Sequence, residues 1–240
     1  MKQRYYLLDA FRGLSILAMV WYHTMWDLVN VCGLQIPWFE SDTGFVIQRT
    51  IRWCFVLLGG FCVSMGSRPL KRGILLLVCS CVVTGASFVA GSPIVFGVLT
   101  FLGLATLLAA LWKWLWRKVT PKAWMPWVGA LVCLLLFLLT VDLEIGRLWK
   151  WTMPRSLYAN NFTALLGFPP LGFSSSDYVP LIPWLFAYGL GYFLYGILKS
   201  RQWLGIFCKF RIAPLEFLGR HSLLIYLVHQ PILFGILYII

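Results

Sequence analysis

Seven long apolar segments dominate this chain and leave little sequence between them. Each runs to about twenty residues, the length that a helix needs to cross the hydrocarbon core of a bilayer. None alternates strictly between apolar and polar residues, as barrel strands do, so helices are the expected spanning elements. With 60% hydrophobic and 12% charged residues, the chain lacks the polar surface of a soluble domain. We predict an all-α polytopic membrane helix bundle, a single domain over 1–240, with seven transmembrane helices over 6–29, 45–66, 73–90, 94–112, 126–141, 179–198 and 219–240.

The charges and cysteines exclude several classes of protein. Net charge is +12, yet most basic residues fall on one side of a seven-helix arrangement. The other side holds the acidic residues Glu40, Asp42, Asp142, Glu144 and Asp177. This positive-inside pattern predicts a cytoplasmic N-terminus and an external C-terminus, so the charge does not indicate a nucleic-acid partner. The seven cysteines form no CxxC or Cys/His spacing, and we predict neither a disulfide framework nor a metal site.

Two connecting stretches are rich in aromatic residues. The internal stretch 113–125 combines tryptophans with basic residues, which favours contact with anionic membrane lipid. The long external stretch 142–178 is expected to lie on the membrane surface or to cap the bundle.

The first segment carries Arg12 and, eleven residues later, His23. Eleven steps return a helix to almost the same face, about 16 Å along its axis. Ionisable groups within a membrane are costly and indicate function. One stripe of one helix therefore carries a cation near one end and a base near the other.

Two acidic residues accompany this pair. Asp9 lies three residues before Arg12, which predicts an ion pair along the helix. Asp27 lies four residues after His23, so its carboxylate can orient the imidazole and raise its basicity. A structural histidine bonded to a backbone carbonyl is the alternative, but the neighbouring charges favour a catalytic pair of His23 and Asp27.

Candidate binding residues come from three other segments. Gln48, Arg49 and Arg52 lie at the depth of Asp27, where an arginine either bridges to Asp27 or stabilises an anion. Asp177 precedes the sixth segment and serves either as a helix N-cap, a role open to Ser176 as well, or as a contact to an acceptor hydroxyl or amine. In the last segment, His229 is predicted to lie about two turns deeper than His221. Small residues in 59–64 and 187–191 are typical of close helix packing.

These blocks together resemble a known family. The matching residues are Asp9-Ala10-Phe11-Arg12-Gly13, His23 and Asp27, Gln48-Arg49 with Arg52, Leu58-Gly59-Gly60, Phe96-Gly97-Val98-Leu99 and the blocks 177–184 and 218–231. The chain resembles the transmembrane acyltransferase superfamily, and within it the small bacterial relatives of heparan-alpha-glucosaminide N-acetyltransferase. It departs from the expected pattern at Thr100, where a histidine is expected, and shows no large external domain.

The resemblance implies transfer of an acetyl or other acyl group from cytosolic acyl-CoA to a sugar hydroxyl or amine on the far side of a bacterial cytoplasmic membrane. By position, His23 is the implied catalytic residue and Arg12 holds the donor. Arg49 and Arg52 are further candidates for the donor or the oxyanion, and Asp177, Gln48 and His229 for the acceptor. The expected partners are thus acyl-CoA, a carbohydrate or glycoconjugate and membrane lipid, with monomer and homodimer both open.

Two other functions compete with this interpretation. A proton-coupled transporter of a small solute would use the same buried ionisable residues as a path, although the chain lacks the internal symmetry common in transporters. A haem-bearing electron carrier would need two deep axial ligands, for which only His23 and His229 are candidates. Direct attack on the thioester and an acyl-histidine intermediate are both compatible with these residues.

Overall fold

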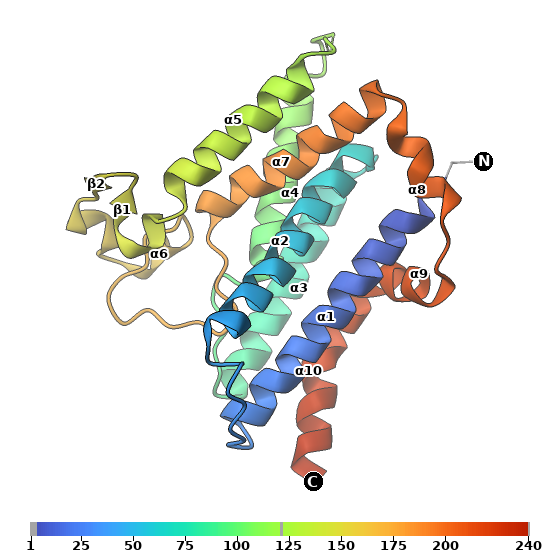
Figure 1. Cartoon of the computed structure of the whole chain (residues 1–240). Helices are drawn as coiled ribbons and strands as arrows, with labels where there is room; N and C mark the ends of the chain where they lie inside the picture. Colours follow the sequence, from blue (N-terminus) through green and yellow to red (C-terminus); the bar gives the residue numbers. More distant parts are fainter. Residues whose placement is uncertain (1–3, 121, 240) are drawn as a thin grey trace. The chain divides into compact units, whose positions relative to one another are not determined.

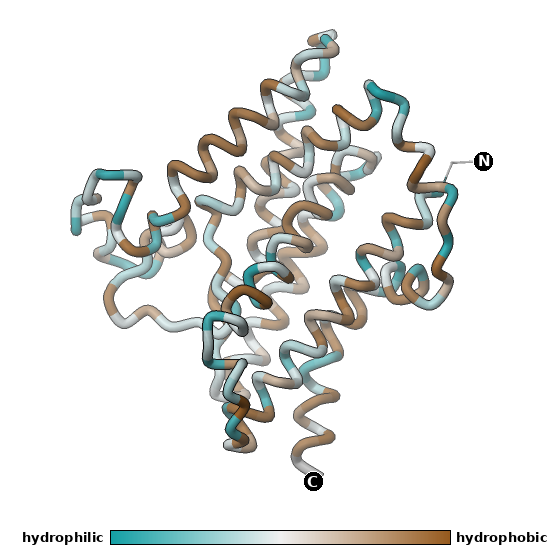
Figure 2. Tube along the Cα trace, viewed as in Figure 1, coloured by the Kyte–Doolittle hydropathy of each residue, from teal (hydrophilic) through white to brown (hydrophobic). Residues whose placement is uncertain are grey.

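The computed structural model describes residues 4–120 and 122–239, which are mostly helical (Figure 1). The long helices are α1 (Tyr6–Asn30), α2 (Asp42–Met65), α3 (Pro69–Val89), α4 (Val98–Leu115), α5 (Met125–Thr140), α7 (Leu181–Ser200) and α10 (Ser222–Ile239). Shorter helices are α6 (Asn161–Ala164), α8 (Ile206–Lys209) and α9 (Ala213–Arg220). Apolar residues run along the helices, while hydrophilic residues gather mainly in the connections (Figure 2).

Five helices, α2, α3, α4, α5 and α7, are long and apolar enough to cross a membrane. The structure is therefore mostly helical and has several helices that could span a membrane, in agreement with the predicted class. Helix α1 does not join the five, because it carries four ionisable side chains, Asp9, Arg12, His23 and Asp27. The apolar part of α10 is a shorter helix, Ser222–Leu237. The count of seven spans, the orientation of the termini and the single domain stay predictions.

The chain forms two compact units. The first contains the described residues up to Phe55 and from Gln202 onward, and the second runs from Val56 to Arg201. Helix α2 begins in the first unit and ends in the second.

In the first unit, α1 packs on α9 and α10. The closest approach is between α1 and α9, where a Cβ atom on Gly13 would lie 2.8 Å from the carbonyl carbon of Leu215. A Cβ atom on Gly219 would lie 2.7 Å from the carbonyl carbon of Asp9. Only glycine fits at both positions, since any side chain would meet backbone of the facing helix. These two glycines bring the N-terminal half of α1 into backbone contact with α9.

The last predicted segment, 219–240, is not one helix. Helix α9 ends at Arg220 and α10 begins at Ser222, with His221 between them in a non-helical conformation. The amide of His221 still donates to the carbonyls of Phe217 and Leu218, which closes α9 in a tight turn. The apolar pattern alone did not reveal this break, and residue 240 lies outside the described residues.

In the second unit, α3 packs on α4, and α7 packs on α5 and α4. A Cβ atom on Gly60 would lie 2.9 Å from the carbonyl carbon of Tyr188, and one on Gly191 would lie 3.0 Å from that of Leu57. Ser64 donates to the carbonyl of Tyr192 across the same helix pair, at 3.1 Å. The predicted packing role of these small residues in α2 and α7 is confirmed.

The long stretch before α7 folds on itself. It contains the 3₁₀ turns η1 (Leu143–Ile145) and η2 (Arg155–Tyr158), the helix α6, and two short antiparallel strands, β1 (Arg147–Leu148) and β2 (Trp151–Thr152). The hydroxyl of Tyr178 donates to the carbonyl of Ala164, and burial raises the pKa of that phenol. These contacts hold the stretch against the start of α7.

Candidate functional site

Arg12 and His23 lie on one uninterrupted helix, α1. No proline or non-helical residue divides the 25 residues of Tyr6–Asn30, so the predicted spacing between the two side chains is kept. The helix separates them by about 16 Å along its axis. The N-terminal end of α1 thus holds the cation, and the C-terminal half holds the imidazole.

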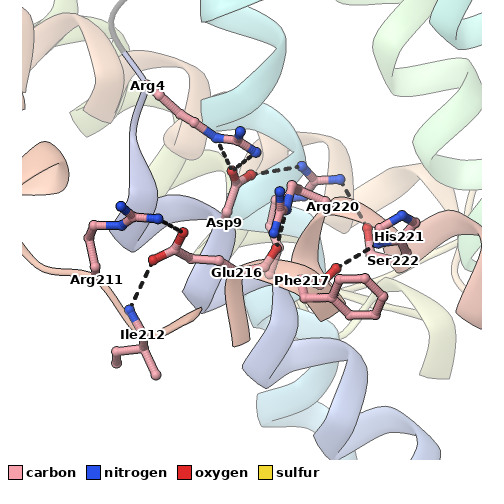
Figure 3. A network of polar contacts seen from close by, with 10 residues as sticks. Arg4, Asp9, Arg211, Ile212, Glu216, Phe217, Arg220, His221 and Ser222 are labelled. Carbon is pink, nitrogen blue, oxygen red and sulfur yellow. Dashed lines mark hydrogen bonds and ion pairs between the residues drawn. The ribbon is translucent and has the colours of Figure 1, made fainter. Parts of the chain in front are cut away.

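Arg12 belongs to a polar network at the N-terminal end of α1. Figure 3 shows other members of this network, among them Arg4, Asp9 and Ser222. Its guanidinium lies 3.5 Å from the carboxylate of Asp9, which confirms the predicted ion pair. It also donates to the hydroxyl of Ser222, the first residue of α10, at 2.9 Å. Arg4 approaches the same Asp9 carboxylate at 3.2 Å. Arg12 is therefore held from two sides, yet 38% of its side chain stays exposed and can meet a ligand.

A second carboxylate, Glu216 on α9, anchors the other half of this network (Figure 3). Its side chain is only 3% exposed, accepts from the backbone amide of Ile212 at 3.0 Å and lies 3.5 Å from the guanidinium of Arg211. The guanidinium of Arg220 donates to the backbone carbonyl of Glu216. Three arginines thus share two carboxylates, and Arg220 adds a fourth cation beside them, which leaves the network with a positive charge.

The imidazole of His23 faces that of His229 on α10. Their ring centroids are 5.0 Å apart and the rings are inclined by 58°. Nδ1 of His229 lies 2.7 Å from the carbonyl oxygen of Tyr226. Because a carbonyl only accepts hydrogen bonds, Nδ1 carries the proton in the neutral ring and Nε2 has the lone pair. The structure therefore brings together two histidines that lie 206 positions apart in the sequence.

The predicted orienting role of Asp27 requires a hydrogen bond to His23, and Asp27 does not form one. The residue is completely buried, and its Oδ1 accepts from Nε2 of Gln230 on α10 at 3.2 Å. The alternative partners, Arg49 and Arg52, form no ion pair with it among the described residues. The helical spacing allowed a contact to His23, but the neighbouring helix supplied the hydrogen-bond partner, Gln230.

The three polar residues of α2 have separate surroundings. The guanidinium of Arg49 lies over the ring of Phe45, 5.4 Å from its centroid. The charge of Arg52 acts on the phenol of Tyr22, the residue before His23. Gln48 is half-buried, and no hydrogen bond links its side chain to a described residue. Of these three residues, Arg52 is thus the one that interacts with Tyr22, the neighbour of His23 in the sequence.

Asp177 belongs to the second unit. The sequence predicted that Asp177 or Ser176 caps the helix that follows, but Asp177 does not cap α7. The residue before α7 is Pro180, which offers no side-chain cap. Asp177 instead accepts through Oδ2 from the amide of Val98, the first residue of α4, at 3.2 Å. Asp177 thus caps a helix, as predicted, but the helix is α4 and not α7. The reason is that the stretch before α7 pairs with the stretch before α4.

Thr100 and His221 have ordinary local partners. The hydroxyl of Thr100 is hydrogen-bonded to that of Ser80 on α3, so the position where a histidine was expected joins α3 to α4. Nδ1 of His221 lies 2.9 Å from the carbonyl of Phe217.

Sequence reasoning missed two residues of the first unit, Ser222 and Gln230, as individual partners. Both lie in the block 218–231 that carried the family resemblance, but no local spacing links them to Arg12 or Asp27. Within the described part of the chain, no cluster of three or more histidine, cysteine or acidic residues could hold a metal ion.

Comparison with known proteins agrees with the resemblance. The sequence model of the family described as "Heparan-alpha-glucosaminide N-acetyltransferase, catalytic" matches residues 4–231. No curated protein and no solved structure matches the chain. The matched range covers nearly all of the sequence, including α1 and the His229-Gln230 pair. The chain therefore belongs to the family of heparan-alpha-glucosaminide N-acetyltransferase catalytic domains, and this membership implies transferase activity in an integral membrane protein.

Proposed function

We propose that this protein transfers an acetyl group from cytosolic acetyl-CoA to a hydroxyl or amine of a sugar on the external side of a bacterial cytoplasmic membrane. The observation that carries the proposal is the arrangement on α1. A positively charged network surrounds Arg12 at one end, and the His23 imidazole faces His229 in the other half.

The donor is proposed to bind through its phosphates at the N-terminal end of α1. Coenzyme A is polyanionic, and the arginines around Arg12 outnumber the carboxylates they share. Guanidinium groups bind phosphate through paired hydrogen bonds in a planar geometry. The distance of about 16 Å along α1 suits an extended pantetheine arm that runs from Arg12 toward His23.

His23 is proposed to act as general base. It takes the proton from the acceptor OH or NH₂ as that atom attacks the thioester carbonyl, which forms a tetrahedral oxyanion. When the oxyanion collapses, the carbon–sulfur bond breaks and the coenzyme A thiolate takes the proton from His23. Such proton transfer contributes about 10²–10⁴-fold to a rate. An acetyl-histidine intermediate is the competing route.

The remaining residues are proposed in supporting roles. Arg52 is the better candidate than Arg49 for the oxyanion, because its charge acts on Tyr22, the residue before His23, whereas Arg49 lies over Phe45. His229 is proposed to contact the acceptor through Nε2, its lone-pair nitrogen. The acceptor roles of Gln48 and Asp177 stay predictions, as do a homodimeric state and specific lipid contacts. The observed partner of Asp27 is Gln230.

The deciding experiment measures acetyl-CoA binding and release of free coenzyme A thiol by the protein in nanodiscs. Arg12→Ala should weaken acetyl-CoA binding, whereas His23→Ala should bind the donor and release no thiol. Arg147→Ala and His221→Ala, which change exposed residues of the same types, serve as matched controls and should behave as wild type.

Absence of donor binding by folded wild type, with or without sugar acceptors, would refute the proposal. Solute flux into vesicles without thiol release would then support the transporter.

A further inference from the structure

The side chains of Asp27 and Gln230 meet in the buried contact between α1 and α10. Oδ1 of Asp27 accepts from Nε2 of Gln230 at 3.2 Å, and the two residues are 203 positions apart. Asp27 is completely buried. Its second oxygen and the amide oxygen of Gln230 are also buried and accept no hydrogen bond from any described residue. Gln230 is therefore the one side chain, within the described structure, that stabilises this carboxyl group.

We infer that Gln230 is a positioning residue, which holds α10 on α1 in the register that sets the His229 imidazole against that of His23. The effect of this register on catalysis rests on the proposed function. The register itself is a structural property that exists whether or not the acyl transfer takes place.

The two contacts are neighbours on both helices. Gln230 directly follows His229 on α10, and Asp27 lies one turn after His23 on α1. A shift of α10 that breaks the bond between Gln230 and Asp27 therefore also moves His229 relative to His23. The distance of 5.0 Å between the imidazole centroids therefore depends on the position of α10 along α1, which the neighbouring bond between Gln230 and Asp27 holds.

The backbone of α10 is weakened at the same point. Pro231 follows Gln230 inside the helix and has no amide hydrogen to donate to the preceding turn. A helix that lacks one hydrogen bond bends more easily there. A side-chain bond to α1 at the residue before the proline fixes the place where α10 is least rigid.

The test exchanges the acid and the amide. Gln230→Glu places two carboxyl groups against each other, and Asp27→Asn places two amides there. The double variant, Asp27→Asn with Gln230→Glu, restores one acid and one amide with the same number of heavy atoms. Gln202→Glu, the same change at an exposed position, is the matched control.

Two measurements are made on each variant. The first is ring-nitrogen NMR of histidine-labelled protein, which is simple because the chain has three histidines. We expect the signals of His23 and His229 to shift in Gln230→Glu and to return in the double variant, while His221 stays unchanged. The second is thiol release from acetyl-CoA, expected to fall about 10-fold in Gln230→Glu and to recover in the double variant, as for a coupled pair.

The outcomes separate the inference from the proposed function. Histidine signals that do not move in Gln230→Glu, or that move equally in the double variant, would overturn the positioning role. Absence of thiol release by wild type would overturn the proposed function, and the NMR result would still decide on Gln230. Loss of activity in both single variants without recovery in the double variant would also count against the pairing.

Discussion

The contact between α1 and α9 gives the sharpest prediction of stability, through Gly219→Ala. The added Cβ atom would lie 2.7 Å from the carbonyl carbon of Asp9 and 3.0 Å from the amide nitrogen of Gly13, whereas ordinary contacts begin at 3.4 Å. All of these neighbours are backbone, which cannot rotate away. The helices must therefore separate, and the bond between Arg12 and Ser222, now 2.9 Å long, is stretched with them.

The size of the effect follows from two opposing terms. Overpacking a close contact costs about 1–3 kcal/mol of unfolding free energy. Alanine is favoured over glycine in a helix by about 1 kcal/mol, which offsets part of this cost. The net loss is about 0–2 kcal/mol, and for a chain of this length it lowers Tm by up to about 8 °C.

Gly235→Ala on α10 is the matched control. No described atom lies within 4 Å of the position where its Cβ atom would be placed. The helix preference then acts alone, and Tm should stay constant or rise. Thermal unfolding is followed by the fluorescence of the thirteen tryptophans in detergent. A Tm for Gly219→Ala equal to or above that of Gly235→Ala would refute the close-packing argument, and acetyl-CoA affinity should fall only in Gly219→Ala.

Three further predictions concern the second unit. Lys113 donates to three carbonyls at the end of α2, so Lys113→Met should lower the unfolding free energy by about 1–3 kcal/mol in a thermal scan, while the exposed Lys118→Met changes nothing. Asp177→Asn keeps an oxygen for the amide of Val98 and should retain the wild-type Tm. Asp177→Leu should lower the unfolding free energy by about 1 kcal/mol. Equal Tm values for the two variants would show that the cap is not stabilising. Burial raises the pKa of Tyr178, so the phenol ionises at lower pH in the unfolded chain than in the folded one. The stabilisation by the neutral phenol is therefore present at neutral pH and is lost as pH rises above about 10. Over that range Tyr178→Phe should show a smaller fall in Tm than wild type.

Local spacing was sufficient for what happens within a single helix. The apolar run from Tyr6 onward predicted one long helix, and the three-residue step from Asp9 to Arg12 predicted their ion pair. Both follow from the fixed geometry of 3.6 residues per turn, which depends on no other part of the chain. The same geometry placed His23 and Arg12 on one helix.

Contacts between helices required the tertiary structure. Asp27 has a possible partner one turn away in His23, yet it binds Gln230 from a distant part of the chain. Likewise Asp177 caps α4 and not the helix that it precedes. Membrane helices have similar apolar surfaces, so their hydropathy does not encode which helix packs on which. The sequence by itself determined most of the long helices and the charges they carry, whereas close approaches such as that at Gly13 and Gly219 decided which side chains meet.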